Sequence, residues 1–165
     1  MVGVTRRIFT RESRSRMLSQ LERLIILRGV GIFAATPEHA LGEVAGVLVE
    51  EEYPAGAIVV QKGDLGTSMH LIVSGRVRVH DGEHILNFLG PRDVFGEMGV
   101  LDPGPRVATV TATEPIVLLR LDSDLLYDLL DRRPEIGRGL IRGLIGHLRA
   151  RVQDIAAARR QLDLL

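Results

Sequence analysis

The stretch Phe95–Val110, FGEMGVLDPGPRVATV, decides how the rest of the chain is interpreted. It places a carboxylate, Glu97, between two glycines, and an arginine, Arg106, nine residues later at the start of an apolar run. The intervening residues 102–105, DPGP, strongly favour a turn. The stretch therefore holds a carboxylate and a guanidinium on either side of a tight bend.

These residue types match the chemistry of a phosphorylated sugar. A phosphate favours a guanidinium and free backbone N–H groups, which Arg106 and the glycine-containing turn at Gly96 and Gly99 provide. A sugar hydroxyl needs a hydrogen-bond acceptor, which Glu97 offers. A cyclic phosphate carries one negative charge that one arginine nearly balances, and Lys62 is the only lysine of the chain. The alternative interpretation is an ion pair between Glu97 and Arg106 that closes a hairpin loop.

The same stretch resembles the phosphate-binding cassette of cyclic-nucleotide-binding domains, such as those of catabolite-activator-like and protein kinase A regulatory-subunit-like proteins. The family pattern reads F-G-E, a small residue among apolar ones, a variable loop and then P-R-x-A-T-V, and each fixed position has a counterpart here. In that family the glutamate holds the ribose 2′-hydroxyl, the arginine pairs with the cyclic phosphate, and backbone amides complete the site. Carried over, these ligand-binding roles fall on Gly96, Glu97, Met98, Gly99, Arg106 and Val107.

The resemblance implies a regulatory sensor that signals by movement of its C-terminal helices. It implies cAMP as the ligand in preference to cGMP, because the family favours guanine with a hydroxyl residue after the arginine, and Val107 has none. His147 and Arg151 on the final helix are both candidates for covering the base. The sequence offers no nucleophile with a base, metal cluster or poised carboxylate pair, so we expect no enzyme and no catalytic residues.

Several alternatives stay open at this point. Some domains with this fold bind no nucleotide, and this chain could be such a dimerisation module, or a homodimer, joined through its last helix. It could be the ligand-binding part of a catabolite-activator-type transcription factor that lacks its DNA-binding part, because the sequence stops at Leu165 with no room for a helix-turn-helix. It could also regulate an effector domain or membrane protein, such as a channel, kinase or cyclase, attached or docked at its N-terminal side.

Length and composition fit one cytoplasmic domain. The 165 residues are 45% hydrophobic but only 4% aromatic, so Val, Leu and Ile must fill the core. A formal net charge of zero argues against a general nucleic-acid binder, and the lack of cysteine excludes disulfides and thiolate metal sites. His80 and His84 flank a turn, but two histidines at strand ends are a weak metal signal, and we expect no metal. Neither a signal peptide nor a membrane span is predicted.

The periodicity predicts an α+β fold, an antiparallel, jelly-roll-like β-roll of eight strands flanked by N-terminal helices and two C-terminal helices. We expect a basic flexible arm over residues 1–12 and a cyclic-nucleotide-binding domain over 13–165. The domain would comprise N-terminal helices at 13–48, the roll at 49–121 and hinge or lid helices at 122–165. Turn signals separate Val- and Ile-rich strands expected at Glu50–Tyr53, Ala57–Gln61, Ser68–Ser74, Arg76–His80, Glu83–Leu89, Asp93–Phe95, Val107–Ala112 and Ile116–Leu121.

The helices before and after the roll have recognisable boundaries. A helix is predicted over Ser13–Arg28, and Thr36 offers a capping hydroxyl for the next one, which continues to Leu48. Asp122 is the predicted cap of a further helix that Pro134 ends.

The last element, Glu135–Leu165, has apolar residues three and four positions apart but contains four glycines. Each glycine costs a helix interior roughly 0.5–1 kcal/mol relative to alanine, so the helix needs packing to stay formed. Gly139 and Gly143 lie one turn apart and would let another backbone approach closely. The helix is therefore either fixed on a neighbour or a lid whose order depends on ligand.

Overall fold

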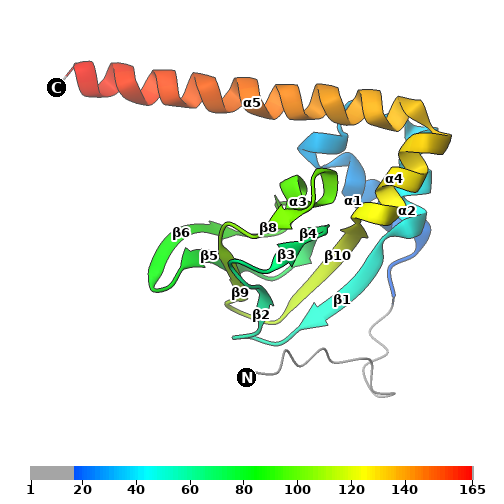
Figure 1. Ribbon diagram of the computed structural model, residues 1–165, viewed down its shortest axis with the longest axis horizontal. Coiled ribbons are helices and arrows are strands. Elements are labelled where there is room, and N and C mark those ends of the chain that lie inside the picture. Colours follow the sequence, from blue (N-terminus) through cyan, green and yellow to red (C-terminus); the bar gives the residue numbers. More distant parts are fainter. Residues whose placement is uncertain (1–16, 165) are drawn as a thin grey trace.

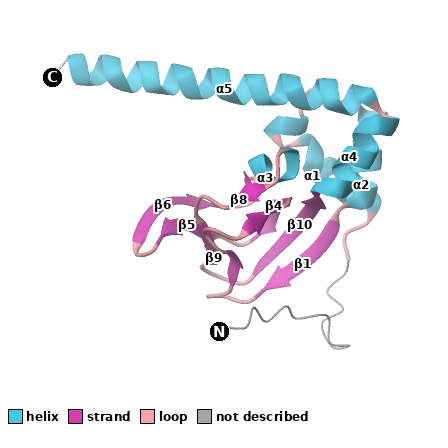
Figure 2. Cartoon of the chain, in the orientation of Figure 1, coloured by secondary structure: helices cyan, strands magenta, loops and turns pink. Residues whose placement is uncertain are grey.

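The computed structural model describes residues 17–164, which form a β-roll with helices at one end and a long helix across its side (Figure 1). The predicted basic arm at 1–12 and the predicted helix start at Ser13 lie outside these residues. Within the described part, no helix is both long and apolar enough to span a bilayer. The α+β architecture with flanking helices agrees with the prediction (Figure 2).

Two four-stranded antiparallel sheets form the roll. The first has the order β1 (Val49–Tyr53), β10 (Ile116–Asp122), β4 (Ser68–Ser74) and β7 (Val94–Phe95). The second has the order β2 (Ile58–Val60), β9 (Thr109–Ala112), β5 (Val77–Asp81) and β6 (His84–Leu89). These are the eight predicted strands.

A separate two-stranded ribbon pairs β3 (Leu65–Gly66) with β8 (Gly104–Pro105). These two strands are not predicted from the sequence, because each is two residues long and lies within a segment rich in turn residues. The ribbon brings the loop before β4 against the segment that leads into Arg106, and so helps to build the site described below.

The core has two parts, one between the sheets and one between the first sheet and the helices. Strand β4 shows the division, because Met69 and Leu71 pack in the cluster that includes the helices, whereas Ile72 packs between the sheets. Alternation of side chains along a strand produces this arrangement. His70, on the same face of β4 as Ile72, therefore points between the sheets as well.

The first helix, α1, spans Gln20–Arg28 and begins later than predicted. Residues 17–19 are not helical, and Ser19 forms the N-cap. Its hydroxyl accepts a hydrogen bond from the Glu22 amide at 3.2 Å, and the Glu22 carboxylate accepts one from the Ser19 amide at 2.8 Å. This reciprocal pair is a capping box, which fixes the start of the helix. A short 3-10 helix, η1 (Gly31–Phe33), and α2 (Glu38–Val47) follow.

Two predicted caps are wrong in their mechanism. The N-cap of α2 is Pro37, and the Thr36 hydroxyl is buried without a hydrogen-bond partner because the last helix packs against it. Asp122 is the N-cap of α4 (Ser123–Arg132), but its carboxylate accepts hydrogen bonds from Arg120 instead of capping the helix. In both cases a tertiary contact replaces the local hydrogen bond that the sequence favours.

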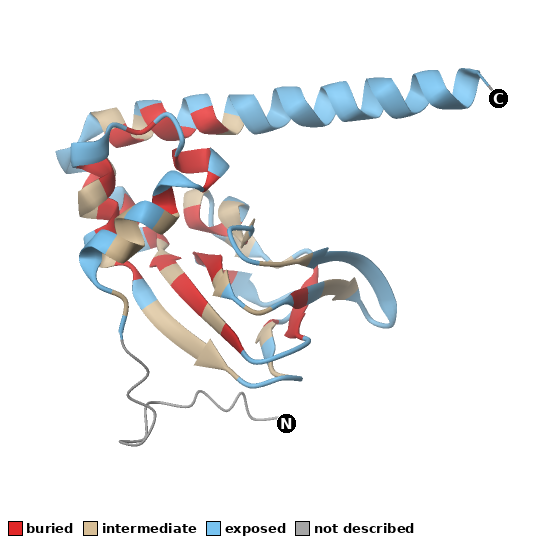
Figure 3. Ribbon diagram, turned by 180° about the vertical axis from the view of Figure 1, so that it is seen from behind, coloured by how far each residue is buried: buried red, intermediate tan, exposed pale blue. Residues whose placement is uncertain are grey.

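The last helix, α5 (Pro134–Asp163), is fixed at its N-terminal end and unsupported beyond it. A Cβ on Gly143 would lie 2.3 Å from the Ile32 carbonyl oxygen, and one on Gly139 would lie 2.6 Å from the Thr36 hydroxyl. The predicted close backbone approach at these two glycines is confirmed. From residue 145 to residue 164 every residue is exposed, and this part of the helix projects beyond the roll (Figure 3).

The glycines of α5 provide a matched test of this packing. Replacing Gly143 by alanine should lower the free energy of unfolding by roughly 1–3 kcal/mol, because the new methyl group would overlap the Ile32 carbonyl. Replacing Gly146, which has open space around its Cα, should raise it by roughly 0.5–1 kcal/mol through helix propensity alone. Urea denaturation measures both. Equal effects of the two substitutions would show that close approach at Gly143 is not what fixes α5.

Candidate functional site

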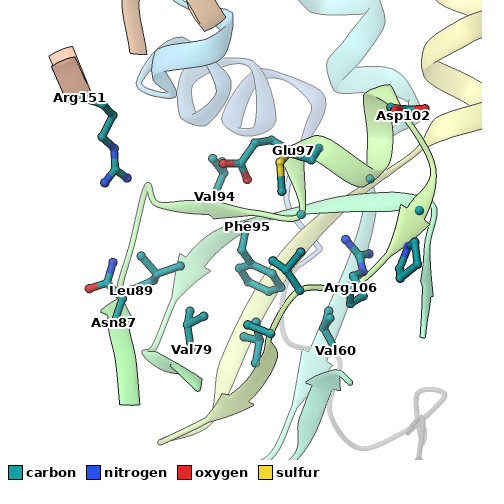
Figure 4. A pocket seen from close by; sticks show the side chains of 18 residues that line it. Val60, Val79, Asn87, Leu89, Val94, Phe95, Glu97, Asp102, Arg106 and Arg151 are labelled. Carbon is teal, nitrogen blue, oxygen red and sulfur yellow. The ribbon is translucent and has the colours of Figure 1, made fainter. Parts of the chain in front are cut away.

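A cavity of about 330 Å³ opens beside β7 and the short helix α3 (Glu97–Leu101), and it is bounded by strands of both sheets (Figure 4). Its wall is mainly apolar, and Glu97, Asp102 and Arg106 add charge near the turn that follows β7. All six residues predicted to bind ligand line this cavity, namely Gly96, Glu97, Met98, Gly99, Arg106 and Val107. The apolar wall comprises Val60, Val79, Leu89, Val94, Phe95, Ala108 and Val110.

The turn into α3 depends on a glycine. Gly96 is the N-cap of α3 and has a φ of 79°, in the left-handed region where a side chain would be strained. The Gly99 amide donates a hydrogen bond to the Gly96 carbonyl oxygen at 3.1 Å. A ligand would therefore have to share the Gly99 N–H, whereas the first amides of α3 have no carbonyl partner within the helix.

Arg106 lies in a recess that three glycines form. A Cβ on Gly66 would lie 2.5 Å from its Nε, and Cβ atoms on Gly96 and Gly99 would lie 2.6 Å and 3.0 Å from its Nη1. The Nη2 group donates to the Ser68 carbonyl oxygen at 2.8 Å and to the Ser68 hydroxyl at 3.2 Å. Side chains at the three glycine positions would push the guanidinium out, so the absence of Cβ atoms defines where this charge can lie.

The charge of Arg106 is not compensated by an acid. Between residues 17 and 164, no carboxylate forms an ion pair with Arg106, and Glu97 forms none either. The alternative of an Arg106–Glu97 ion pair closing a loop is therefore wrong for this structure. Burial of the guanidinium lowers the pKa of Arg106 from its usual value, because the charged form loses part of its hydration. The guanidinium is a half-buried cation, and within the described part of the chain only its Nη2 group donates to protein acceptors, so it is suited to bind an anionic ligand.

The other predicted site residues differ in exposure. Glu97 is half-buried at the cavity, whereas the side chains of Met98 and Val107 are 64% and 69% exposed. Their exposure agrees with the predicted use of their backbone amides, because a role for the backbone places no demand on side-chain burial. The same exposure leaves both apolar side chains free to cover part of a ligand.

A family model for the cyclic nucleotide-binding domain matches residues 50–133, which run from the first strand through α4 and include every residue lining the cavity except Arg151. The chain belongs to the cyclic nucleotide-binding domain family. It is 33% identical to the CRP-like cAMP-activated global transcriptional regulator of Mycobacterium tuberculosis over 136 residues, which are 79% of this chain and 61% of that protein. The chain thus spans about three fifths of the length of this relative.

Solved structures of this family superimpose on the chain. The N-terminal domain of a transcriptional regulator from Streptomyces coelicolor is 30% identical with a TM-score of 0.70, covering 78% of this chain and 93% of that one. The regulatory domain of Toxoplasma gondii PKA, solved with cAMP, is 29% identical with a TM-score of 0.62, covering 67% of this chain and 44% of that one. The predicted family and β-roll fold are confirmed.

The structure also separates the two candidates for covering the base in this cyclic nucleotide-binding domain. Arg151 of α5 lines the cavity and reaches toward it in Figure 4. His147 lies one turn earlier and contacts η1 instead, since a Cβ on Gly31 would lie 2.2 Å from its Nε2. Arg151 is therefore the residue of α5 that the fold places at the cavity.

Three residues at the site are absent from the sequence prediction. Gly66 and Ser68 surround the Arg106 guanidinium, and Asn87 lines the cavity from β6. Gly66 belongs to the turn segment QKGDLG, where a glycine has an ordinary explanation, and Ser68 and Asn87 lie in strands. Strand pairing brings them to the site, β3 with β8 for Gly66, β4 with β10 for Ser68 and β5 with β6 for Asn87, so no local signal identifies them.

The weak metal signal at the β5–β6 hairpin has a structural explanation. The Nδ1 atom of His80 lies 2.7 Å from the Gly82 carbonyl oxygen, and its Nε2 atom lies 2.7 Å from the Thr111 hydroxyl. Among the described residues, no group of three or more His, Cys, Asp or Glu side chains could hold a metal ion. His80 instead ties the hairpin to β9.

A buried histidine supports the floor of the cavity. The ring of His70 stacks on Phe95 with centroids 4.9 Å apart and planes 14° apart, and its Nδ1 has no hydrogen-bond partner. Glu51 lies 3.9 Å from its Nε2, but that carboxylate is already paired with Arg120. Burial, together with the charges of Arg106 and Arg120, lowers the pKa of His70 from 6.5 to about 3, so the ring is neutral at physiological pH.

This histidine should make the fold sensitive to acid. In the unfolded chain His70 has a pKa of 6.5 and binds a proton below that pH, whereas in the folded chain it stays neutral down to about pH 3. The free energy of unfolding therefore decreases as the pH is lowered from 6.5 to about 3. The contribution is at most about 1.4 kcal/mol per pH unit. Replacing His70 by phenylalanine should remove it, and should cost little at pH 7 because an unpaired buried polar atom is lost.

Urea denaturation of both proteins at several pH values between 7 and 4 measures the difference in slope. The carboxylates titrate in both proteins and cancel in the comparison. His84→Ala, on the exposed hairpin, is the control and should leave the slope unchanged. Parallel curves for the parent and His70→Phe would contradict a neutral, buried histidine.

Proposed function

We propose that this chain is a regulatory sensor domain that binds cAMP in preference to cGMP and does no chemistry on it. The proposal rests on Arg106, whose guanidinium lies without an ion-pair partner among the described residues at the edge of a cavity of about 330 Å³. A cyclic phosphate would supply the single negative charge, and Glu97, which lines the same cavity, would accept a hydrogen bond from the ribose 2′-hydroxyl. The cavity volume falls in the range of small-ligand pockets.

Two observations favour adenine over guanine. Val107 follows Arg106 and carries no hydroxyl that could bond the guanine amino group. The M. tuberculosis relative is a cAMP-activated regulator, and the T. gondii regulatory domain was solved with cAMP. Arg151, which reaches the cavity from α5, would lie over the base, where a guanidinium can stack on an aromatic ring.

Two contacts would connect the site to the C-terminal helices. The Tyr127 hydroxyl of α4 donates a hydrogen bond to the Leu101 carbonyl at the end of α3. Arg151 places α5 at the opposite side of the cavity. A ligand that holds α3 and Arg151 together favours one arrangement of α4 and α5 only as far as it binds that arrangement more tightly. Because Gly143 fixes the start of α5, the moving part would be the helix beyond residue 144.

Removal of the guanidinium tests the proposed function. Arg106→Ala should weaken cAMP binding by at least about 30-fold, because the loss of one partner from a buried charge pair costs about 2–5 kcal/mol. Isothermal titration calorimetry with cAMP and cGMP gives both affinities. Arg78→Ala is the matched control, since Arg78 lies on β5 beside the cavity wall but is exposed on its outer face. Equal affinities of the Arg106→Ala and parent proteins would remove Arg106 from its assigned role.

Dimerisation through α5 is a second proposed property, and the exposed part of that helix supports it. The structure separates Leu144, which packs against the core, from Ile145, which lies on the exposed face. The exposed apolar positions then alternate by four and three residues, as in a coiled-coil seam. They are Ile141, Ile145, Leu148, Val152, Ile155 and Leu162, between 42% and 69% exposed, with Arg159 at the remaining seam position.

The exposed part of α5 has an apolar stripe that the described residues do not bury, and an apolar helix face is normally covered by a partner. A second copy of the chain is the simplest partner, because the stripe is self-complementary about a two-fold axis. One core position of the stripe holds the β-branched Ile145 and Val152, and the other alternates isoleucine with leucine at Ile141, Leu148, Ile155 and Leu162, so the apolar side chains do not by themselves select the number of helices. Arg159 would interrupt the seam and restrict its register.

Two substitutions in the seam should abolish this dimer. Leu148→Asp with Ile155→Asp places charges where two helices would meet, so the chain should sediment as a monomer while the parent sediments as a dimer. The control, Gln153→Asp with Gln161→Asp, adds the same charges on the other face of α5 and should leave the mass unchanged. Sedimentation equilibrium distinguishes the two masses. A parent protein that is monomeric at 100 μM, with or without cAMP, would contradict the seam.

The role of the whole protein is a further part of the proposal. The similar proteins include two transcriptional regulators and the regulatory domain of a kinase, so this chain would be the ligand-binding part of a catabolite-activator-type transcription factor or a module that regulates a channel or kinase. In the alternative arrangement, residues 13–165 form a domain that acts in the cytoplasm. An effector would then be attached or docked at the N-terminal side of this domain. A nucleotide-free dimerisation module of this fold would keep the seam but would have no need for an unpaired Arg106, which makes it the weaker candidate.

A further inference from the structure

The cavity has polar groups at two ends. Arg106 and Asp102 lie at one end, whereas Asn87 and Arg151 lie at the other, with Phe95 between them (Figure 4). The proposed function places the phosphate at Arg106 and the ribose at Glu97. A nucleotide held in this way extends its base toward Asn87 and Arg151, so these two side chains are the polar groups that the base would meet.

Asn87 is directed at the cavity by the register of the β5–β6 hairpin. It pairs with Val79 on the neighbouring strand, and cross-strand partners lie on the same face of a sheet. Val79 is part of the apolar cavity wall, so Asn87 lies on the cavity face as well. The adjacent pair, Arg78 and Phe88, lies on the opposite, outer face.

The orientation of the Asn87 amide is set by a local hydrogen bond. Its Oδ1 accepts a hydrogen bond from the Phe88 amide at 2.8 Å, which distinguishes the oxygen from the nitrogen of the side chain. An amide oxygen has two lone pairs, and the amide nitrogen has two N–H donors. Asn87 therefore keeps one acceptor position on Oδ1 and both donors on Nδ2, side by side at the edge of the cavity.

We propose that Asn87 recognises the Hoogsteen edge of adenine and so contributes the base selectivity of the site. That edge presents the N6 amino group as a donor beside N7 as an acceptor, which is the complement of Oδ1 and Nδ2. Guanine presents O6 and N7, two acceptors, and its O6 would face Oδ1 of Asn87. A pyrimidine has no second ring and no N7. The inference rests on the proposed binding of a cyclic nucleotide with its phosphate at Arg106.

Arg151 cannot supply this selectivity. A guanidinium has five donors and no acceptor, so it would bond O6 and N7 of guanine at least as well as the adenine edge. It also comes from the part of α5 beyond residue 144, where every described residue is exposed. Asn87, in contrast, is held on a strand and has a fixed amide, which is the arrangement that a discriminating contact needs.

A comparison of cAMP with 7-deaza-cAMP, which replaces N7 by a C–H group, tests this contact. Calorimetry should show the parent protein binding cAMP about tenfold more tightly than 7-deaza-cAMP, since one hydrogen bond is lost. Asn87→Ala should bind the two ligands alike, at about the affinity of the parent for 7-deaza-cAMP or below, and its preference for cAMP over cGMP should fall about tenfold. Asn87→Asp should prefer 7-deaza-cAMP, because its carboxylate repels the N7 lone pair.

Phe88→Leu, a change on the outer face of the same strand, is the control and should reproduce the affinities of the parent. Asn87 is exposed, so its variants should melt at the temperature of the parent, and this is checked by circular dichroism. If Asn87→Ala still distinguishes cAMP from 7-deaza-cAMP as the parent does, the assignment of Asn87 is wrong while the cAMP site stands. If the parent binds no cyclic nucleotide, the assignment falls together with the proposed function.

Discussion

The position of the Arg106 guanidinium is the constraint on which the site depends. A half-buried charge with no ion-pair partner in the described part of the chain is costly, and here only the carbonyl and hydroxyl of Ser68 compensate it. The recess exists because Gly66, Gly96 and Gly99 carry no Cβ atoms. These glycines come from the β3 ribbon and from both ends of one turn of α3, so the sheet pairing and the turn must both form before the charge has a place to lie.

The long helix α5 shows how one element can combine anchoring with freedom. Its first turns are held by backbone contact with η1, at a distance that only glycine permits at Gly143. Its later turns carry large apolar side chains into solvent. Arg151 belongs to these later turns and lines the cavity. The glycines that lower the helix propensity are therefore not a sign of a weak helix throughout. They concentrate its stability at one end and leave the other end to respond to a ligand or a partner.

The sequence predicts the fold well, and the six residues that it assigns to ligand binding lie around one cavity, because both outcomes depend on local pattern. The spacing between Glu97 and Arg106, the alternation of the strands and the turn glycines carry that information without any tertiary contact. The prediction is wrong where a distant element changes a local preference, as at Thr36, whose hydroxyl lies under α5, and at Asp122, whose carboxylate binds Arg120. Ser68, which accepts hydrogen bonds from the guanidinium, is brought to the site by strand pairing across the roll and has no sequence signal of its own.

The site joins groups from both sheets and from the last helix. Arg106 precedes a strand of the second sheet, its hydroxyl partner lies on a strand of the first, and the polar groups at the far end come from β6 and α5. A small ligand that touches all of them closes a gap between the two sheets and the last helix at once. Because the apolar wall is present already, such a ligand gains its binding energy mainly from burial, whereas the few charged and amide groups determine its orientation. In the function proposed above, the part of α5 beyond residue 144 would be the part that moves most, because every described residue there is exposed.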